Sequence, residues 1–137
     1  MVETSDNISV TIVTPSGTQV EFDVQHLRAP GSEGEFGVLH GHLPLMTALK
    51  IGTLRLDTEK GQQVWATSGG YIEVLGSQVI ILAETAEKSD KIDLERAEVA
   101  KERALGRLSD RSTDIDIKRA TLALARAINR IKVSAEF

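Results

Sequence analysis

The stretch YIEVLGSQVIILAETAEKSDKIDLERAEVAKERALGRL, residues 71–108, decides the fold, because the period of its apolar residues changes along it. Residues 71–75 and 79–82 have the composition of two short β-strands, and Gly76-Ser77 between them is a turn signal. From about residue 90 onward, small apolar residues recur at helical spacing instead. These residues are Ala97, Ala100, Ala104 and Leu108. The sequence therefore predicts a β half that is followed by an α half.

The residues before this stretch continue the strand pattern back toward the N-terminus. Alternating apolar residues at 8–12 and 20–24 flank the turn signal at residues 15–17, which predicts a hairpin. Two further strand-like runs, 52–56 and 63–67, flank a polar turn and are followed by a glycine pair. Many short strands separated by glycine-rich turns are typical of a β-sandwich or barrel.

The residues after this stretch predict a second helix, whose apolar positions follow helical spacing. They are Ala120, Ala123, Leu124, Ala127, Ile128 and Ile131. Residues 109–114 are a short polar connector, which predicts an antiparallel helical hairpin, and Thr113 with Asp116 resembles a capping box. Burial of apolar surface contributes ~0.8 kcal/mol per methylene, and alanine has only one methyl group to bury. We therefore expect the hairpin to be marginally stable and able to change position.

Composition restricts the classes of function. The chain has 137 residues, of which 41% are hydrophobic and 26% are charged, so it can bury a core. A net charge of −4 argues against nucleic acid as the main partner, because phosphates require a basic face. The sequence contains no cysteine, which excludes internal disulfides, thiolate zinc sites and cysteine nucleophiles.

The sequence also bears on membrane association. Its apolar runs stay well below the ~20 residues that a membrane-spanning helix needs, and the longest, residues 79–83, has the length of a strand. The first six residues are polar and acidic, unlike a signal peptide. We therefore expect any membrane association to come through a protein partner.

The segment GSEGEFGVLHGHLPL, residues 31–45, resembles the signature segment of the epsilon subunits of bacterial-type F1Fo ATP synthases. The resemblance covers essentially the whole chain in order, including residues 68–74 of the β half and residues 92–97 and 123–127 of the α half. It implies an α+β fold: an N-terminal ten-stranded β-sandwich over residues 1–87, and a C-terminal antiparallel two-helix hairpin over residues 88–137.

The same resemblance implies a function. Members of this family are non-catalytic subunits of the central stalk, and their sandwich contacts the gamma subunit and the c-subunit ring. They help couple proton-driven rotation to catalysis in the alpha/beta hexamer, and their C-terminal helices inhibit ATP hydrolysis. The implied location is the cytoplasmic face of the bacterial plasma membrane, where the complex holds the subunit peripherally. No cofactor is required, and ATP is the one regulatory ligand that the resemblance implies.

The glycine-rich segment holds the first candidate residues. On sequence alone it reads as a surface loop with tight turns, and it lacks the lysine of a P-loop. In the family, Glu35 matches a position that contacts the polar loops of c, and His42 matches one near gamma. His40 and His42 would bind a metal if His26 or a carboxylate joined them, but nothing in the sequence places a third ligand, so no metal site is predicted.

Arginines repeat on the helical half with the same spacing on each helix. They are Arg96, Arg103 and Arg107, then Arg119, Arg126 and Arg130. Three interpretations stay open: solvated faces that pair with nearby acids, docking on acidic parts of the beta subunits, and binding of ATP.

The ATP interpretation comes from the resemblance. Some bacterial members bind ATP in the folded hairpin through a motif [I/L]-D-x-x-R-A, which residues 92–97 match. Asp93 would accept a hydrogen bond from adenine or ribose, the arginines would face the phosphates, and bound ATP would favour the folded, non-inhibiting hairpin. The implied binding residues are Glu87, Ile92, Asp93, Arg96, Ala97, Arg103, Arg126 and Arg130.

Two other classes of function are disfavoured. Trp65 and Tyr71 are expected in the sandwich core or at its rim rather than on a base-stacking platform, which would need a basic surface. The sequence contains no nucleophile elbow and no recognisable acid/base pair, which argues against a stand-alone enzyme.

Overall fold

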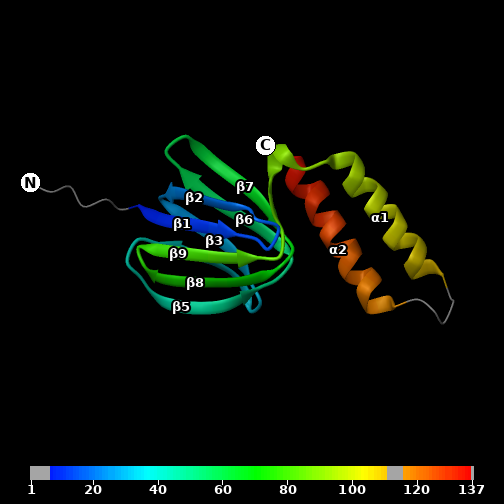
Figure 1. Ribbon diagram of the computed structural model, residues 1–137, viewed down its shortest axis with the longest axis horizontal. Helices are drawn as coiled ribbons and strands as arrows, with labels where there is room; N and C mark the ends of the chain where they lie inside the picture. Colours follow the sequence, from blue (N-terminus) through cyan, green and yellow to red (C-terminus); the bar gives the residue numbers. More distant parts are fainter. Residues whose placement is uncertain (1–6, 111–115, 137) are drawn as a thin grey trace, which may run out of the picture.

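The computed structural model describes residues 7–110 and 116–136, which form a β-sandwich followed by two antiparallel helices (Figure 1). This arrangement confirms the ten-stranded sandwich and the helical pair predicted from the sequence. The strands are β1 (Ile8–Val13), β2 (Gln19–Val24), β3 (His26–Gly31), β4 (Gly34–Leu39), β5 (His42–Leu49), β6 (Gly52–Thr58), β7 (Gly61–Thr67), β8 (Gly70–Gly76), β9 (Gln78–Ala83) and β10 (Ala86–Lys88). A short 3-10 turn, η1 (Ser89–Lys91), leads to α1 (Leu94–Ser109) and α2 (Ile117–Ser134).

The strands form one hydrogen-bonded path that folds into two layers. Its order is β10-β7-β6-β3-β5-β8-β9-β1-β2, and β4 pairs with β3. The last strand of the path, β2, meets β7 near its other end across the core, where the rings of Phe22 and Trp65 have centroids 5.8 Å apart. Trp65 is buried in this core, whereas Tyr71 on β8 is exposed on the outer surface.

Aliphatic side chains fill the space between the layers, as the strand alternation predicts. In β1, Ile8, Val10 and Ile12 are fully buried, and Leu54 of β6 and Ile72 of β8 belong to the same buried cluster. Each such side chain contributes ~1.5–3 kcal/mol when it leaves water. The sandwich is therefore the firmly held part of the molecule.

The surface loop predicted for residues 31–45 is wrong, because most of this segment is strand: it forms β4 and the start of β5. Its glycines serve a tight turn and a close approach rather than a flexible loop. Gly41 has a φ of +80° in the turn between β4 and β5. A Cβ on Gly37 would lie 2.8 Å from Nε2 of His26, so glycine leaves room for that ring.

Each helix begins at an aspartate. The Asp93 carboxylate accepts a hydrogen bond from the backbone N–H of Arg96 at 3.0 Å, and Asp116 accepts one from Arg119 at 3.1 Å. Both contacts have the geometry of an N-cap. The capping box predicted from Thr113 differs from this, because Asp116 itself is the cap; Thr113 lies outside the described residues.

The seam between the helices consists of small residues, as the sequence predicts. Ala97 and Ala104 of α1 and Ala120 and Ala127 of α2 are buried. Ile128, predicted on the same face, is instead 47% exposed. The reason is geometric, because residue 128 lies about 100° around the helix from the buried Ala127.

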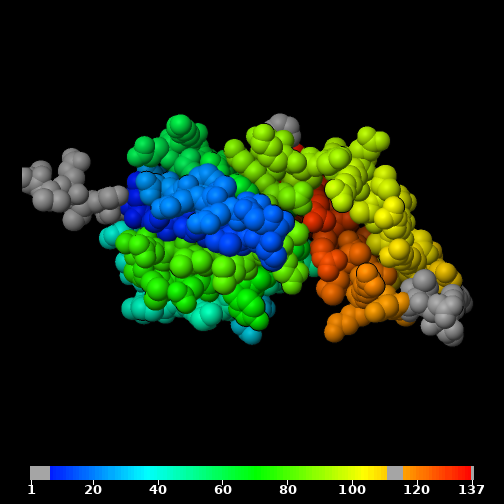
Figure 2. Space-filling model, in the orientation of Figure 1, coloured from blue at the N-terminus to red at the C-terminus, as the bar shows by residue number. Residues whose placement is uncertain are grey.

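α2 is the helix that packs on the sandwich, and α1 packs on α2 (Figures 1 and 2). Val133 of α2 is buried against Val64 and Ala66 of β7. The Asn129 side chain donates a hydrogen bond to the Gly52 carbonyl at 2.7 Å. Arg55 of β6 also donates two hydrogen bonds of 3.1 Å to the Glu136 carboxylate. This small, partly polar contact holds the helices less firmly than the core holds the strands.

Substitution of glycine by alanine should change the stability of the two halves in opposite directions. A Cβ on Gly70, where φ is +143°, would lie 1.9 Å from the Leu82 carbonyl oxygen, so Gly70→Ala should destabilise the sandwich by ~2 kcal/mol or more. Gly106 in α1 has open space around it, so Gly106→Ala should stabilise the helical half by ~0.5–1 kcal/mol. Urea unfolding followed by far-UV circular dichroism measures both; equal shifts would contradict this account.

Candidate functional site

A cleft with a volume of about 670 Å³ lies between the end of the sandwich and the helices. Its sandwich side carries hydroxyl groups, from Thr14, Ser16, Thr18 and Thr85. Its helical side carries charged and small side chains, from Lys91, Asp93, Arg96, Ala97, Val99, Ala100 and Arg103. Ala86, Glu87 and Arg130 complete the lining. The volume is in the range of small-molecule sites, which is ~300–1,000 Å³.

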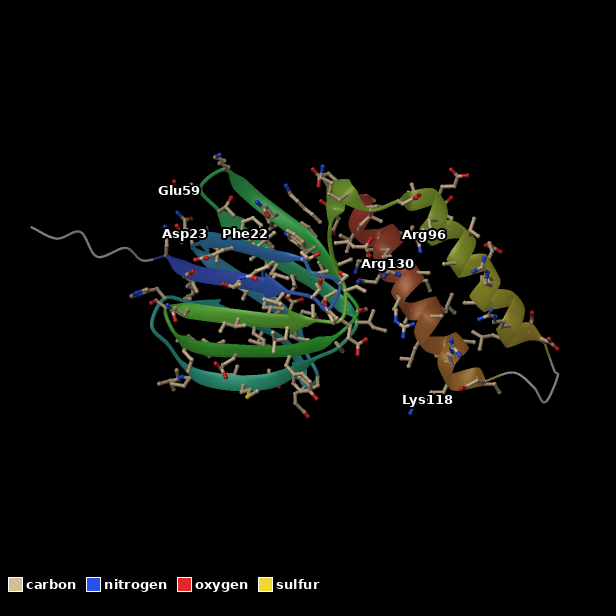
Figure 3. The ribbon with its side chains drawn as sticks, in the orientation of Figure 1. Phe22, Asp23, Glu59, Arg96, Lys118 and Arg130 are labelled. Atoms are coloured by element: carbon tan, nitrogen blue, oxygen red, sulfur yellow. The ribbon has the colours of Figure 1, made fainter. Side chains whose placement is uncertain are left out.

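The structure brings together six of the eight residues implied as ATP-binding. Those that line the cleft are Glu87, Asp93, Arg96, Ala97, Arg103 and Arg130. Ile92 lies outside it, packed against the small cluster of Val64, Ala66 and Val133. Arg126 lines a separate narrow hollow beside Asn129 and Arg130. In Figure 3, Arg96 on α1 and Arg130 on α2 extend toward the same gap.

Arg130 joins the two halves of the molecule at the cleft. Its Nε donates a hydrogen bond to Glu87 Oε1 at 2.6 Å, and its Nη2 lies 3.4 Å from Thr85 Oγ1. Both side chains of the ion pair are partly buried. A charge-assisted hydrogen bond in such a setting is stronger than a fully exposed pair. The pair therefore fastens α2 to β10.

The remaining charges make the cleft attractive to anions. Within the described residues, Lys91, Arg96 and Arg103 form no ion pair, while Glu87 is already neutralised by Arg130. Asp93 directs one carboxylate oxygen to the N-terminus of α1. Guanidinium groups suit phosphate oxygens, and a carboxylate suits a hydrogen-bond donor. The cleft can therefore hold a small polyanion that also carries donor groups.

Sequence reasoning missed the sandwich side of the cleft. Residues 14–18 carry an ordinary turn signal, and nothing local indicates that this turn faces a helix far along the chain. Lys91 was missed as well, because it stands just before the recognised motif. Asn129 and Glu136, which hydrogen-bond to the sandwich, were missed likewise, because the sequence shows nothing about them beyond their polarity.

A second, smaller hollow of about 340 Å³ lies among His26, His40 and His42. The His42 Nδ1–H donates a hydrogen bond to the Leu43 carbonyl, and His26 Nδ1 lies 3.4 Å from the Asp57 carboxylate. A hydrogen bond from Gln62, and then the nearby His26, lower the pKa of Asp57, although burial opposes them. Within residues 7–110 and 116–136, no three potential metal ligands are grouped closely enough to hold a metal ion.

The predicted interface residues Glu35 and His42 are not neighbours. Glu35 is exposed near the start of β4, and His42 begins β5 after the turn that follows β4. The stretch of β4 from Glu35 to Leu39 alone spans about 13 Å, at ~3.3 Å per residue, so Glu35 and His42 lie at opposite ends of this strand. The two side chains therefore belong to different parts of any interface.

The outer face of β5, β8 and β9 exposes large apolar side chains. The strand register places Tyr71 beside Leu82 and Glu73 between Met46 and Ile80. Met46 is 67% exposed, and Tyr71 and Leu82 are more than half exposed. The apolar run of β9 supplied a signal for this face, because alternate residues of a strand must point outward. Exposed apolar patches of this kind are typical of protein-interaction surfaces.

Together, these features define the class of fold: a β-sandwich with an exposed apolar face on β5, β8 and β9, and a helical pair docked at its end. In the described parts of the chain, no helix has the length and apolar character needed to cross a membrane. The chain belongs to the ATP synthase delta/epsilon chain family. The family's beta-sandwich domain profile matches residues 7–89, and its long alpha-helix domain profile matches residues 90–135.

Similar proteins carry the name ATP synthase epsilon chain. The one from Desulforapulum autotrophicum is 48% identical over 107 residues, which cover 77% of this chain and 79% of the relative. The one from Bacillus pumilus is 45% identical over 97 residues, covering 71% and 74%.

Solved structures of two ATP synthases contain a similar fold. A chain of the Euglena gracilis mitochondrial enzyme (OSCP/F1/c-ring) matches with a TM-score of 0.79 and 24% identity, covering 99% of this chain and 85% of the other. A chain of the Tetrahymena thermophila mitochondrial enzyme (central stalk and c-ring) matches with a TM-score of 0.56 and 14% identity, covering 94% of both chains. At these sequence identities, the structural similarity shows that this chain shares the fold of those two chains.

The Arg130–Glu87 pair predicts a measurable loosening when it is removed. Arg130→Ala should shift the docked helices toward an open form by ~1 kcal/mol, since one charge-assisted contact is lost. Chymotrypsin cleavage in the helices should therefore become about fivefold faster. Arg119→Ala is the control, because it removes the same charge from an exposed position of α2. Equal cleavage rates for both variants would contradict the fastening role.

Proposed function

We propose that this chain is a non-catalytic rotor subunit in the central stalk of a proton-translocating F1Fo ATP synthase, where it helps couple rotation to ATP synthesis. The observation that carries this proposal is the match of both family profiles, in order, from residue 7 to residue 135. It acts at the cytoplasmic face of the bacterial plasma membrane, as a peripheral part of the F1 sector. It requires no cofactor and no nucleic acid, and the complex provides its membrane association.

The gamma subunit is the proposed partner of the apolar face on β5, β8 and β9. Tyr71, Leu82 and Met46 contribute little to the sandwich core, since they point away from it. A partner that covers them removes this apolar surface from water. Glu35 and His42 extend the contact, Glu35 toward the polar loops of the c-subunit ring and His42 toward gamma.

The helical pair is the proposed inhibitor of ATP hydrolysis. Its alanine seam and small contact with β6 and β7 support release without unfolding of the sandwich. Released helices would carry their exposed arginines toward acidic surfaces of the alpha/beta hexamer, where opposite charges steer association.

Sensing of ATP is a second proposed role of the same helical pair. It is favoured by the cleft, which gathers six residues of the implied ATP-binding set. Two of them, Arg96 and Arg103, and also Lys91 lack an ion pair within the described residues. ATP bound there would stabilise the docked state over the released one, because a ligand favours the state that it binds better. A wild-type chain that binds no ATP at millimolar concentration contradicts this second role.

The partner face predicts loss of the gamma contact in a charge variant. Leu82→Asp places a charge beside Tyr71 on the apolar face and should reduce co-purification with gamma more than tenfold. Ile117→Asp is the matched control, because it also charges an exposed apolar residue, at the start of α2 where a negative charge is tolerated. Undiminished recovery of gamma with a folded Leu82→Asp chain would exclude this face.

A further inference from the structure

The turn between β1 and β2 forms an ordered wall of hydroxyl groups opposite α1. The Thr14 backbone N–H donates to the Thr18 carbonyl at 3.0 Å, and the Gly17 N–H donates to the Thr14 carbonyl at 3.1 Å. Thr14 Oγ1 also accepts from the Thr18 N–H at 3.2 Å and lies 3.0 Å from Ser16 Oγ. These internal bonds fix the turn, so its outer hydroxyls are held in place before any ligand arrives.

The Ser16 and Thr18 hydroxyls of this turn can each form a further hydrogen bond. Within the described residues, Ser16 Oγ bonds only to Thr14, and Thr18 Oγ1 bonds to no other side chain. Each hydroxyl can donate one hydrogen bond. Both residues line the cleft, at the end of the sandwich that faces the helices (Figure 1).

Lys91 is a further cation of the cleft. It is exposed, it lines the cleft, and it forms no ion pair within residues 7–110 and 116–136. Its neighbour Lys88 differs in both respects, because Lys88 lies 3.9 Å from the Asp90 carboxylate and does not line the cleft. Lys91 is therefore a free positive charge beside Arg96 and Arg103.

The motif I-D-x-x-R-A occurs twice in this chain, at residues 92–97 and again at residues 115–120. In both copies the aspartate caps its helix through the backbone N–H of the arginine, at 3.0 Å for Asp93 and 3.1 Å for Asp116. Only the first copy faces the β1–β2 turn, since Arg96 lines the cleft and Arg119 does not. The motif alone therefore does not produce a cleft. The two copies differ because only the first one faces the β1–β2 turn of the sandwich.

We propose that the β1–β2 turn and Lys91 belong to the nucleotide site, and that a bound triphosphate chain spans from the α1 cations to the Ser16 and Thr18 hydroxyls. This inference rests on the ATP-sensing role proposed above. It adds three recognition residues outside the recognised motif. It also assigns Lys91 to the distal phosphates, so that the site distinguishes a triphosphate from a monophosphate.

Charge and connectivity support this assignment. A triphosphate carries several negative charges, and the cleft offers Lys91, Arg96 and Arg103, which have no competing ion pair in the described part of the chain. α1 is otherwise held through α2, so a ligand that bonds both α1 and the β1–β2 turn joins two elements that the cleft separates. The ligand would thereby clamp α1 to the sandwich directly.

Calorimetric titration of the full chain with ATP, AMP and inorganic triphosphate tests the proposal. Lys91→Ala should weaken the binding of ATP and of inorganic triphosphate about fivefold, because one phosphate–cation contact is lost. The same substitution should weaken the binding of AMP less than twofold. Ser16→Ala combined with Thr18→Val should weaken the binding of ATP about fivefold or more, because two hydrogen bonds are lost. Lys88→Ala and Ser77→Ala, which remove the same groups outside the cleft, should leave each affinity within twofold of wild type.

The outcomes separate this inference from the role on which it rests. ATP affinities of both cleft variants within twofold of the wild-type value would overturn the inference and leave ATP sensing standing. A wild-type chain that binds neither ATP nor inorganic triphosphate would overturn both. Hydrogen exchange gives an independent reading: saturating ATP should slow exchange in residues 94–109 of the wild type, and unchanged exchange there would overturn the clamp. Circular dichroism confirms that each variant is folded, and Lys91→Gln replaces Lys91→Ala if needed.

Discussion

The docking of α2 on the sandwich is the interaction on which the helical half of the molecule depends. One apolar side chain, Val133, is buried on β7, while Asn129 bonds the Gly52 backbone at 2.7 Å and Arg130 pairs with Glu87 at 2.6 Å. α1 takes its position from α2 through a seam of buried alanines. The cleft exists only while this docking holds, because its walls come from the sandwich on one side and from the helices on the other.

The two halves differ in how firmly they are held, and the proposed regulation rests on that difference. Fully buried residues such as Ile12, Leu54 and Ile72 each contribute ~1.5–3 kcal/mol to the sandwich, whereas an alanine buries a single methyl group. In the proposed mechanism, the helices leave while the sandwich remains folded and bound to its partner. A polyanion in the cleft would oppose this release, because it would bind only when both walls are present. The same weak docking would then serve both the proposed inhibition and its control by a ligand.

The sequence predicted those features that follow from local periodicity. Alternation placed Ile8, Val10 and Ile12 in the core, and helical spacing predicted the Ala97–Ala104 stripe. It failed where tertiary placement decides. Residues 34–39 form a strand because β3 pairs with them, and residues 42–45 do so because β8 pairs with them, whereas their glycines suggested a loop. The implied ATP-binding residues came from a resemblance and were mostly brought together, but Ser16, Thr18 and Lys91 came from neither periodicity nor motif. Contacts between a turn and a helix so far apart in the chain depend on topology, which local patterns do not carry.

The hydrogen-exchange order of the unliganded full-length chain tests the central claim most directly. The account predicts that the amides of β8 and β9 exchange slowest, that those of α2 exchange faster, and that those of α1 exchange fastest of the three, because α1 depends on α2 for its position. Exchange in residues 94–109 and 117–134 that is as slow as in β8 and β9 would contradict it. The helices would then be part of one cooperative unit with the sandwich, and their release would require unfolding of the whole chain.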